Sequence, residues 1–253
     1  RGGAFTFFEH GRPEPGFQLI LSTTTRFFGG DPFAVRLTPI FLSLLAIAVV
    51  YWATLQVLSD RPLPHRHIGA LLASGALMTS LGFITLSRAI ERGIPQILFM
   101  GLFIGALALF YHKRRWRDAI FAGIALSGTI YFYTAGLALP AVLAPIGLWL
   151  LLFQSHTWKN WLPRFIGMGA VVVLLTLPWS IALLTNSRLI LDRAGEVMGT
   201  GLTIDRAISL TWSHLLIAGD PNSQYNTASD PMILALFQPF FILGLGALLV
   251  RVK

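Results

Sequence analysis

The sequence predicts an all-α membrane protein, a polytopic bundle of about seven transmembrane helices with interfacial helices on its outer face. Only 12% of its 253 residues are charged and the mean hydropathy is +0.68, whereas a soluble domain carries about 25% charged residues. Apolar runs of nearly the length that spans a bilayer as a helix also recur along the chain. The composition therefore argues against a soluble enzyme, and no nucleic-acid partner is expected.

The apolar segments divide the chain into one transmembrane domain over residues 1–253. We expect an outer loop with an interfacial helix over 1–36, six spans over 37–185, a second outer loop over 186–231 and a last span over 232–253. The fourth and fifth apolar segments are nearly continuous, so a tight turn is placed at 134–136, where Gly136 can supply the turn backbone. The predicted spans are Leu37 to Leu58, Ile68 to Leu86, Ile94 to Tyr111, Ala119 to Thr134, Leu137 to Phe153, Phe165 to Thr185 and Met232 to Val250.

The distribution of charge predicts the orientation. If the loops alternate across the membrane, one side receives only two acidic residues, Asp60 and Asp118, beside a large excess of bases. The other side carries as many acidic as basic residues. Basic short loops face the cytoplasm, so residues 1–36 and 186–231 are expected outside. The bases on the inner side are Arg61, Arg66, Lys113, Arg114, Arg115, Arg117, Lys159, Arg164, Arg251 and Lys253.

The first outer segment contains a short helical stretch, Gln18 to Arg26, which Gly29-Gly30 ends. It is too short and too rich in serine and threonine to span a membrane, so it is expected to lie at the interface. Pro15 suits the first turn of a helix and places Glu14 at its start. From composition alone, the more frequent interpretation of Glu14 is a solvated carboxylate favoured by the helix dipole, with a site residue as the alternative.

The second outer segment joins the second and third predicted spans and carries two arginines. Arg88 and Arg92 are four residues apart, so they share a face if this stretch is helical. Two guanidinium groups at the outer boundary suit a phosphate, because each can bind it with two hydrogen bonds. Snorkelling toward lipid headgroups is the alternative, and the residues alone leave the two equal.

The long outer loop, 186–231, is the third candidate, because a loop of this length is often functional. It contains an amphipathic stretch followed by a polar turn with Asp220, which suits a sugar hydroxyl or a metal, or merely caps the turn. Tyr133, at the outer end of the fourth span, suits sugar stacking or phosphate contact, although aromatic belts explain such tyrosines well. A divalent metal is left open and no other cofactor is expected.

Four stretches, in this order, resemble the integral-membrane glycosyltransferases of the C fold class (GT-C), specifically the family 39-like group. That group includes protein O-mannosyltransferases and the bacterial lipid A aminoarabinose transferase. The resemblance covers nearly the whole chain, and its order and spacing are more specific than any single piece. The stretches are Glu14-Pro15 with Phe28-Gly29 and Ala34-Val35-Arg36-Leu37; Leu86-Ser87-Arg88 with Arg92; Ile130-Tyr131-Phe132-Tyr133-Thr134-Ala135; and Gly219-Asp220-Pro221-Asn222 with Asn226.

The resemblance implies a membrane transferase that moves a sugar from a polyprenyl-phosphate donor to a protein, lipid or glycan acceptor at the outer face. Glu14 matches the second acidic position of the family's first outer loop. The main catalytic base is expected upstream of Arg1, in a chain that is N-terminally incomplete. Pro13 separates Arg12 from Glu14, so Arg12 stands one place from the family's arginine. Substrate contacts are implied for Arg88, Arg92, Arg12, Tyr133, Asp220 and Asn226.

Two other functions remain open at this stage: a transporter or flippase for a lipid-linked sugar, and an inactive fragment. A transporter would use the same outer arginines and a lipid groove, but it would need no acceptor site. Paired inverted repeats would favour transport, whereas a carboxylate-bearing outer loop favours the enzyme. The expected location is a bacterial plasma membrane, with the lipid bilayer as a partner throughout.

Overall fold

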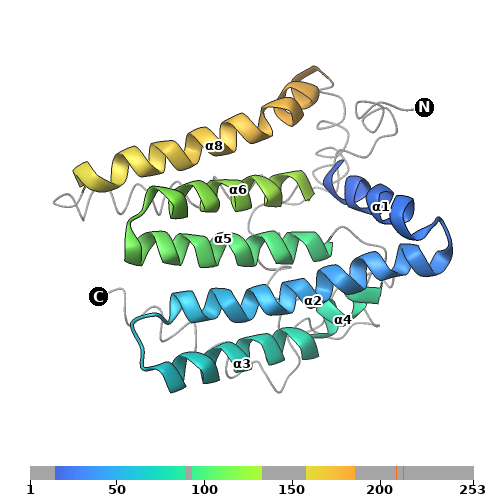
Figure 1. Ribbon diagram of the computed structural model, residues 1–253, viewed down its shortest axis with the longest axis horizontal. Helices are drawn as coiled ribbons and strands as arrows, with labels where there is room; N and C mark the ends of the chain where they lie inside the picture. Colours follow the sequence, from blue (N-terminus) through green and yellow to red (C-terminus); the bar gives the residue numbers. More distant parts are fainter. Residues whose placement is uncertain (1–14, 89–92, 133–157, 186–208, 210–212, 214–253) are drawn as a thin grey trace.

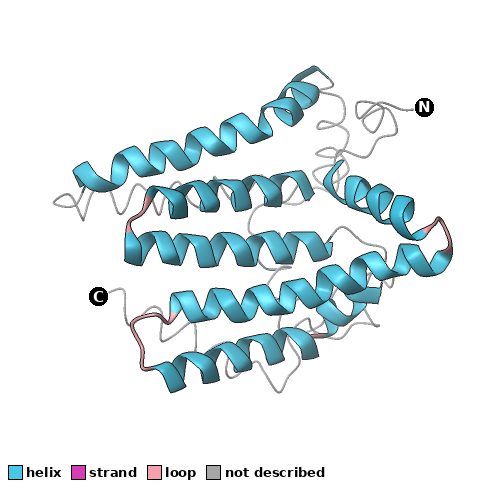
Figure 2. Ribbon diagram, in the orientation of Figure 1, coloured by secondary structure: helices cyan, strands magenta, loops and turns pink. Residues whose placement is uncertain are grey.

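The computed structural model describes residues 15–88, 93–132 and 158–185, together with Ser209 and Ser213. Within these ranges the regular secondary structure is entirely helical, with short turns between helices (Figure 2). The prediction of an all-α, polytopic membrane protein is therefore confirmed. The predicted spans 137–153 and 232–250 lie outside the described residues, as does the outer loop 186–231 apart from the two isolated serines, so the count of seven spans stays a prediction.

Five helices lie side by side in the order α8, α6, α5, α2, α3, with α1 across one end of the bundle (Figure 1). Three of them contain stretches long and apolar enough to cross a membrane, Val35–Val57, Gly93–Lys113 and Trp161–Ile181. Many leucines on the outside of the bundle are exposed, as suits a lipid environment. The helices are α1 Pro15–Phe28, α2 Pro32–Val57, α3 Leu63–Thr79, α4 Leu81–Arg88, α5 Gly93–Lys113, α6 Trp116–Phe132 and α8 Trp158–Thr185.

The helix predicted over Gln18 to Arg26 is present and extends to the proline and glycine that are expected to bound it. Helix α1 starts at Pro15 and stops at Phe28, and Gly29 follows with a φ of 91°, a left-handed conformation that glycine adopts without a steric penalty. Phe17 is buried against the bundle, whereas Leu19 and Phe27 are exposed. One apolar side of α1 therefore packs on the bundle end, and other apolar side chains face outward.

The second predicted span, Ile68 to Leu86, is not one continuous helix. Helix α3 ends at Thr79, Ser80 is extended with a ψ of 130°, and α4 begins at Leu81. The Ser80 hydroxyl donates to the Leu77 carbonyl at 2.9 Å and accepts the Phe83 amide at 3.3 Å. Ser80 thus satisfies backbone groups of both helices, which is why the chain breaks there although its hydropathy continues.

Glycines allow the neighbouring helices to approach closely. Gly101 and Gly105, spaced G-x-x-x-G on α5, face Val49 and Trp52 of α2, and Gly123 of α6 faces α8. In a bilayer, helices associate through such close packing, since apolar side chains gain little from leaving lipid. The later glycine of α5 meets the later residue of α2, since Gly101 faces Val49 and Gly105 faces Trp52, so α2 and α5 run parallel (Figure 1).

The turn between α5 and α6 is closed by an arginine in an unusual conformation. Arg114 has a φ of 53°, and its amide donates to the Phe110 carbonyl at 2.8 Å. A left-handed residue at a helix C-terminus is ordinarily glycine, because Cβ makes this conformation cost about 1–2 kcal/mol. The Arg114 guanidinium lies 5.2 Å from the centre of the Trp161 ring in α8. This cation–π contact offsets part of the backbone cost.

Two substitutions at Arg114 separate these opposing effects. Arg114→Ala loses the contact with Trp161 but keeps a Cβ in the left-handed conformation, so we expect it to lower the free energy of unfolding. Arg114→Gly loses the same contact but removes the backbone cost, so we expect it to be about 1 kcal/mol more stable than the alanine variant. Unfolding in detergent measures both. Equal stability of the two variants would contradict the backbone explanation.

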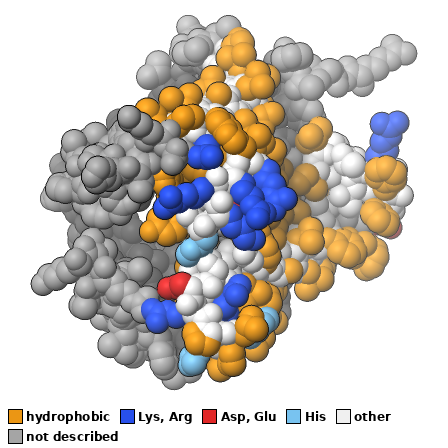
Figure 3. Space-filling view, turned by 60° about the vertical axis from the view of Figure 1, so that its left-hand side comes forward, with side chains coloured by type: hydrophobic (Ala, Val, Ile, Leu, Met, Phe, Trp, Pro, Cys, Tyr) orange, Lys and Arg blue, Asp and Glu red, His pale blue; other side chains and the backbone are white. Residues whose placement is uncertain are grey.

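The bundle has one strongly basic end, formed by the α2–α3 turn, the α5–α6 turn and the start of α8 (Figure 1). Figure 3 shows Lys and Arg side chains gathered on this end. Among the side chains that the structure describes here, the acids are only Asp60 and Asp118. The predicted grouping is therefore seen for the described side chains, whereas the side chains of Lys159, Arg251 and Lys253 lie outside them. The described bases are Arg61, Arg66, Lys113, Arg114, Arg115, Arg117 and Arg164.

Candidate functional site

Most residues that the sequence singled out for chemistry lie outside the described residues. Arg88 is the last residue of α4, and of the candidates it alone falls within a described helix. Two further candidates are direct sequence neighbours of described helices: Glu14 precedes the first residue of α1, and Tyr133 follows the last residue of α6. The candidates outside the described ranges are Arg12, Glu14, Arg92, Tyr133, Asp220 and Asn226.

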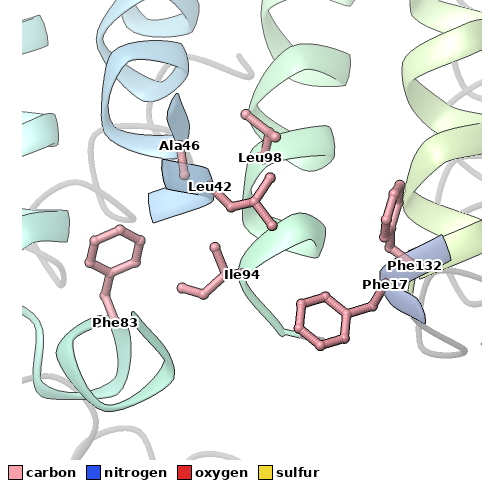
Figure 4. Close-up of a cluster of buried hydrophobic side chains, with 7 residues drawn as sticks. All are labelled: Phe17, Leu42, Ala46, Phe83, Ile94, Leu98 and Phe132. Atoms are coloured by element: carbon pink, nitrogen blue, oxygen red, sulfur yellow. The ribbon is translucent and has the colours of Figure 1, made fainter. Parts of the chain in front are cut away.

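The described neighbours of four candidates meet at the end of the bundle opposite the basic end. A buried apolar cluster there joins α1, α2, α4, α5 and α6, and Figure 4 shows its side chains directed toward one another. The cluster includes Phe17, three residues after Glu14; Ile94, two after Arg92; and Phe132, directly before Tyr133. Leu86, two residues before Arg88, packs against it. We call this place the candidate end.

Two close contacts at the candidate end bind these elements together. A Cβ at Gly16 would lie 2.8 Å from Cδ1 of Phe132 and 3.0 Å from the Tyr131 carbonyl oxygen, so the first turn of α1 rests on the last turn of α6. A Cβ at Gly93 would lie 3.1 Å from Cδ2 of Leu86, so the start of α5 rests on α4. Helix α1, which begins one residue after Glu14, therefore touches α6, which ends one residue before Tyr133. Helix α4, which ends at Arg88, likewise touches α5, which begins one residue after Arg92.

Thr38 of α2 is a polar residue at this end that the sequence analysis missed. Its side chain is only 3% exposed, and its Oγ1 has no hydrogen-bond partner in the described structure. The other buried hydroxyls of the described residues all have a carbonyl partner. Ser43, Ser127 and Thr176 donate to the carbonyl four residues earlier at 2.6–2.8 Å, Thr129 donates to the one three residues earlier at 2.6 Å, and Ser74 donates to Ile47 at 3.5 Å. Buried polar groups are ordinarily paired, so the Thr38 hydroxyl is an exception that requires a reason.

The packing of α2 shows where Thr38 lies. Leu42, one turn later on the same face, belongs to the same cluster as Ile94, the second residue of α5. Because α2 and α5 run parallel, Thr38 lies one turn beyond Ile94 toward the candidate end. Gln96, in the first turns of α5, also has a buried Oε1 without a partner in the described structure. No sequence signal could have identified these two groups, since threonine and glutamine are unremarkable in sequence. Their burial without a partner is visible only in the tertiary structure.

Tyr131 serves the packing of helices. Its hydroxyl donates to the Leu175 carbonyl of α8 at 2.8 Å, so α6 and α8 are joined at the candidate end. Tyr131 therefore has a packing role, while Tyr133 stays a candidate. Within the described ranges there is no group of three histidine, cysteine or acidic side chains placed to hold a metal ion.

Comparison with known proteins places the chain in a wider group. The family model described as dolichyl-phosphate-mannose-protein mannosyltransferase matches residues 11–181, well over half of the chain. No curated protein and no solved structure matches it. The matched range includes Arg12, Glu14, Arg88, Arg92 and Tyr133, whereas Asp220 and Asn226 lie beyond it.

Proposed function

The chain belongs to the dolichyl-phosphate-mannose-protein mannosyltransferase family, and we propose that it transfers a hexose, with mannose the first candidate, from a polyprenyl-phosphate carrier to an acceptor at the outer face of a membrane. It is a multi-pass membrane protein of a glycosyltransferase family. Because the family description names a protein acceptor, a serine or threonine hydroxyl of a protein is the first acceptor to test. The candidate end is the proposed site of transfer.

One observation carries this proposal. Segments far apart in the sequence, each adjoining a candidate residue, pack into one cluster at the end of the bundle opposite the basic end. Basic ends of membrane bundles face the cytoplasm, which supports an outward-facing candidate end. A donor whose lipid tail lies among membrane helices would present its phosphate and sugar at such an end.

The arginines supply the chemistry that the donor requires. Cleavage of a sugar–phosphate bond leaves negative charge on the departing polyprenyl phosphate, and fixed cations lower the barrier by stabilising that charge. We propose Arg88, at the C-terminus of α4, and Arg92, directly before α5, for this role. Arg12, Tyr133, Asp220 and Asn226 stay proposed substrate contacts, and Glu14 is the proposed carboxylate on the donor or acceptor side.

The decisive experiment follows the donor. The protein is purified with its lipid and given polyprenyl-phosphate mannose that carries a radioactive sugar, together with serine- and threonine-containing peptides. We expect free polyprenyl phosphate and labelled peptide to appear together. Movement of intact donor across a vesicle bilayer without cleavage would instead show transport and overturn the proposal.

Thr38 provides a test within the described structure. Thr38→Val keeps the shape of the side chain but removes the hydroxyl, which has no partner among the described residues. If that hydroxyl donates to the phosphate, kcat/KM for the donor should fall about tenfold or more, because a hydrogen bond to a charged group contributes about 1.5–3 kcal/mol. Stability should stay equal or rise, since an unpaired buried hydroxyl is unfavourable. Unchanged transfer kinetics would remove Thr38 from the site.

The proposed orientation can be checked by labelling, because the sequence has no cysteine. A single cysteine at Gly30→Cys, where the surrounding space is open, should react with a membrane-impermeant maleimide on intact cells. Ser59→Cys, in the α2–α3 turn of the basic end, should react only after the cells are broken. The reverse pattern would place the candidate end in the cytoplasm.

A further inference from the structure

The turn between α5 and α6 concentrates more positive charge than any other described segment of similar length. It carries Lys113, Arg114, Arg115 and Arg117, all of them exposed. Arg164, in the second turn of α8, lies against the same turn through its contact with Trp116. We call these five residues the basic turn. It lies at the basic end, away from the candidate end (Figures 1 and 3).

The acids near the basic turn do not neutralise it. Asp118 is 7% exposed, and its Oδ1 lies 3.7 Å from Nε of Arg117, whose side chain is 70% exposed. Asp60 lies in the α2–α3 turn, 3.9 Å from Arg61. The basic turn therefore presents a net positive surface where the helices leave the apolar layer.

Two reciprocal ring contacts hold part of the basic turn in place. Arg114 of the turn lies over Trp161 of α8 at 5.2 Å, and Arg164 of α8 lies over Trp116 of α6 at 5.9 Å. Trp161 also packs edge-on to Phe110, at 5.2 Å between ring centres. A guanidinium placed over an aromatic face keeps its N–H groups at the edge of the stack, where they can bind an anion.

We propose that the basic turn is a binding site for the headgroup of an anionic phospholipid. A phosphodiester is the anion present at the depth where the helices enter water, and arginines bind it with paired hydrogen bonds. Trp116 and Tyr111, about half exposed beside the turn, are residues of the kind that lie at headgroup level. Charge alone suffices to orient a membrane protein, but orientation requires neither the two ring contacts nor the left-handed Arg114 that makes one of them.

The test compares lipids directly. The full chain is reconstituted in phosphatidylcholine bilayers, and the immobilised fractions of spin-labelled phosphatidylglycerol and spin-labelled phosphatidylcholine are measured at low and high salt. We expect the wild-type chain to prefer phosphatidylglycerol and to lose part of this preference in high salt, which screens charge. Replacing Arg115 and Arg117 together by glutamine should reduce the preference by roughly fivefold for each arginine. Both side chains are exposed, but Arg117 lies 3.7 Å from the buried Asp118, so thermal unfolding in detergent is measured to check that the double variant folds.

Two matched variants distinguish a lipid-binding site at the basic turn from a general attraction of anionic lipid by the positive charge of the whole basic end. Arg61→Gln removes a positive charge from the same end but from the α2–α3 turn, and it should change the preference little. Replacing Arg115 and Arg117 by lysine keeps the charge but loses the paired hydrogen bonds, so it should lose part of the preference, whereas a general attraction would keep all of it. An equal loss in Arg61→Gln, an unchanged preference in the double glutamine variant, or release of the labelled lipid by millimolar inorganic phosphate would each overturn the proposal.

Discussion

Arg88→Ala is expected to lower sugar transfer from polyprenyl-phosphate mannose by about 100- to 1,000-fold. The size of this effect follows from the charge that the leaving phosphate develops, since removing one fixed donor to such a charge costs about 2.7–4 kcal/mol in the transition state. Arg88 ends α4, beside Leu86, which packs against the cluster at the candidate end. The measurement is kcat and KM for the donor, with thermal unfolding in detergent to confirm that the variant folds.

Two controls sharpen the Arg88 prediction. Arg88→Lys keeps the charge but loses the paired hydrogen bonds, so it should recover only part of the rate. Arg26→Ala removes an exposed arginine from the last turn of α1, at the same end of the bundle, and should leave kcat unchanged. A loss in Arg26→Ala as large as in Arg88→Ala would point to a general surface charge effect and contradict the assigned role.

Gly123→Ala is expected to destabilise the bundle by about 1–3 kcal/mol, the usual range for overpacking. A Cβ at Gly123 would lie 2.8 Å from the Met168 carbonyl oxygen and 3.1 Å from Cβ of Val171. Neither atom can turn away, because one belongs to the backbone and the other is fixed to it, so α6 and α8 must move apart. Tyr131 and Leu175, which join the same two helices, would then separate as well.

Gly169→Ala is the matched control for this prediction. Gly169 belongs to α8, one residue after Met168, and a Cβ there would meet nothing within 4 Å. In a helix alanine is favoured over glycine by about 1 kcal/mol, so Gly169→Ala should leave stability equal or raise it. Unfolding by denaturant in detergent measures both variants. If Gly123→Ala proved as stable as Gly169→Ala, the close contact between α6 and α8 would not limit their approach.

The positions of the described helices could be predicted largely from local sequence. Gly93–Lys113 and Trp116–Phe132 extend the apolar segments predicted at 94–111 and 119–134 by a few residues at their basic ends. Pro15 and Gly29 bound α1 because proline suits a first helical turn and glycine a left-handed end. Within the described residues, hydropathy misjudged the continuity of the helix at Ser80, where a hydroxyl competes for the backbone. It also placed the start of the sixth span at Phe165, although α8 begins at Trp158.

The candidate site could be predicted less fully. Arg88 and Glu14 drew attention through residue type, spacing and the resemblance, and their described neighbours do meet at one end. Their roles stay predictions. No sequence signal selects Thr38, because a threonine in an apolar helix ordinarily donates to a carbonyl of the preceding turn. Thr176, for example, donates to the Val172 carbonyl at 2.7 Å. Thr38 is set apart by its burial and by the absence of a hydrogen-bond partner among the described residues.

The amino-acid composition and the distribution of charge are enough to predict a helical membrane protein with one basic side. Both properties depend on composition averaged over some twenty residues, which the thickness and charge asymmetry of a bilayer select. Only the tertiary structure decided that Gly123 must stay small, that Arg114 lies over Trp161, and that the first turn of α1 rests on α6. Such contacts join residues tens of positions apart, and no local property of the chain specifies which glycine or ring will meet which partner.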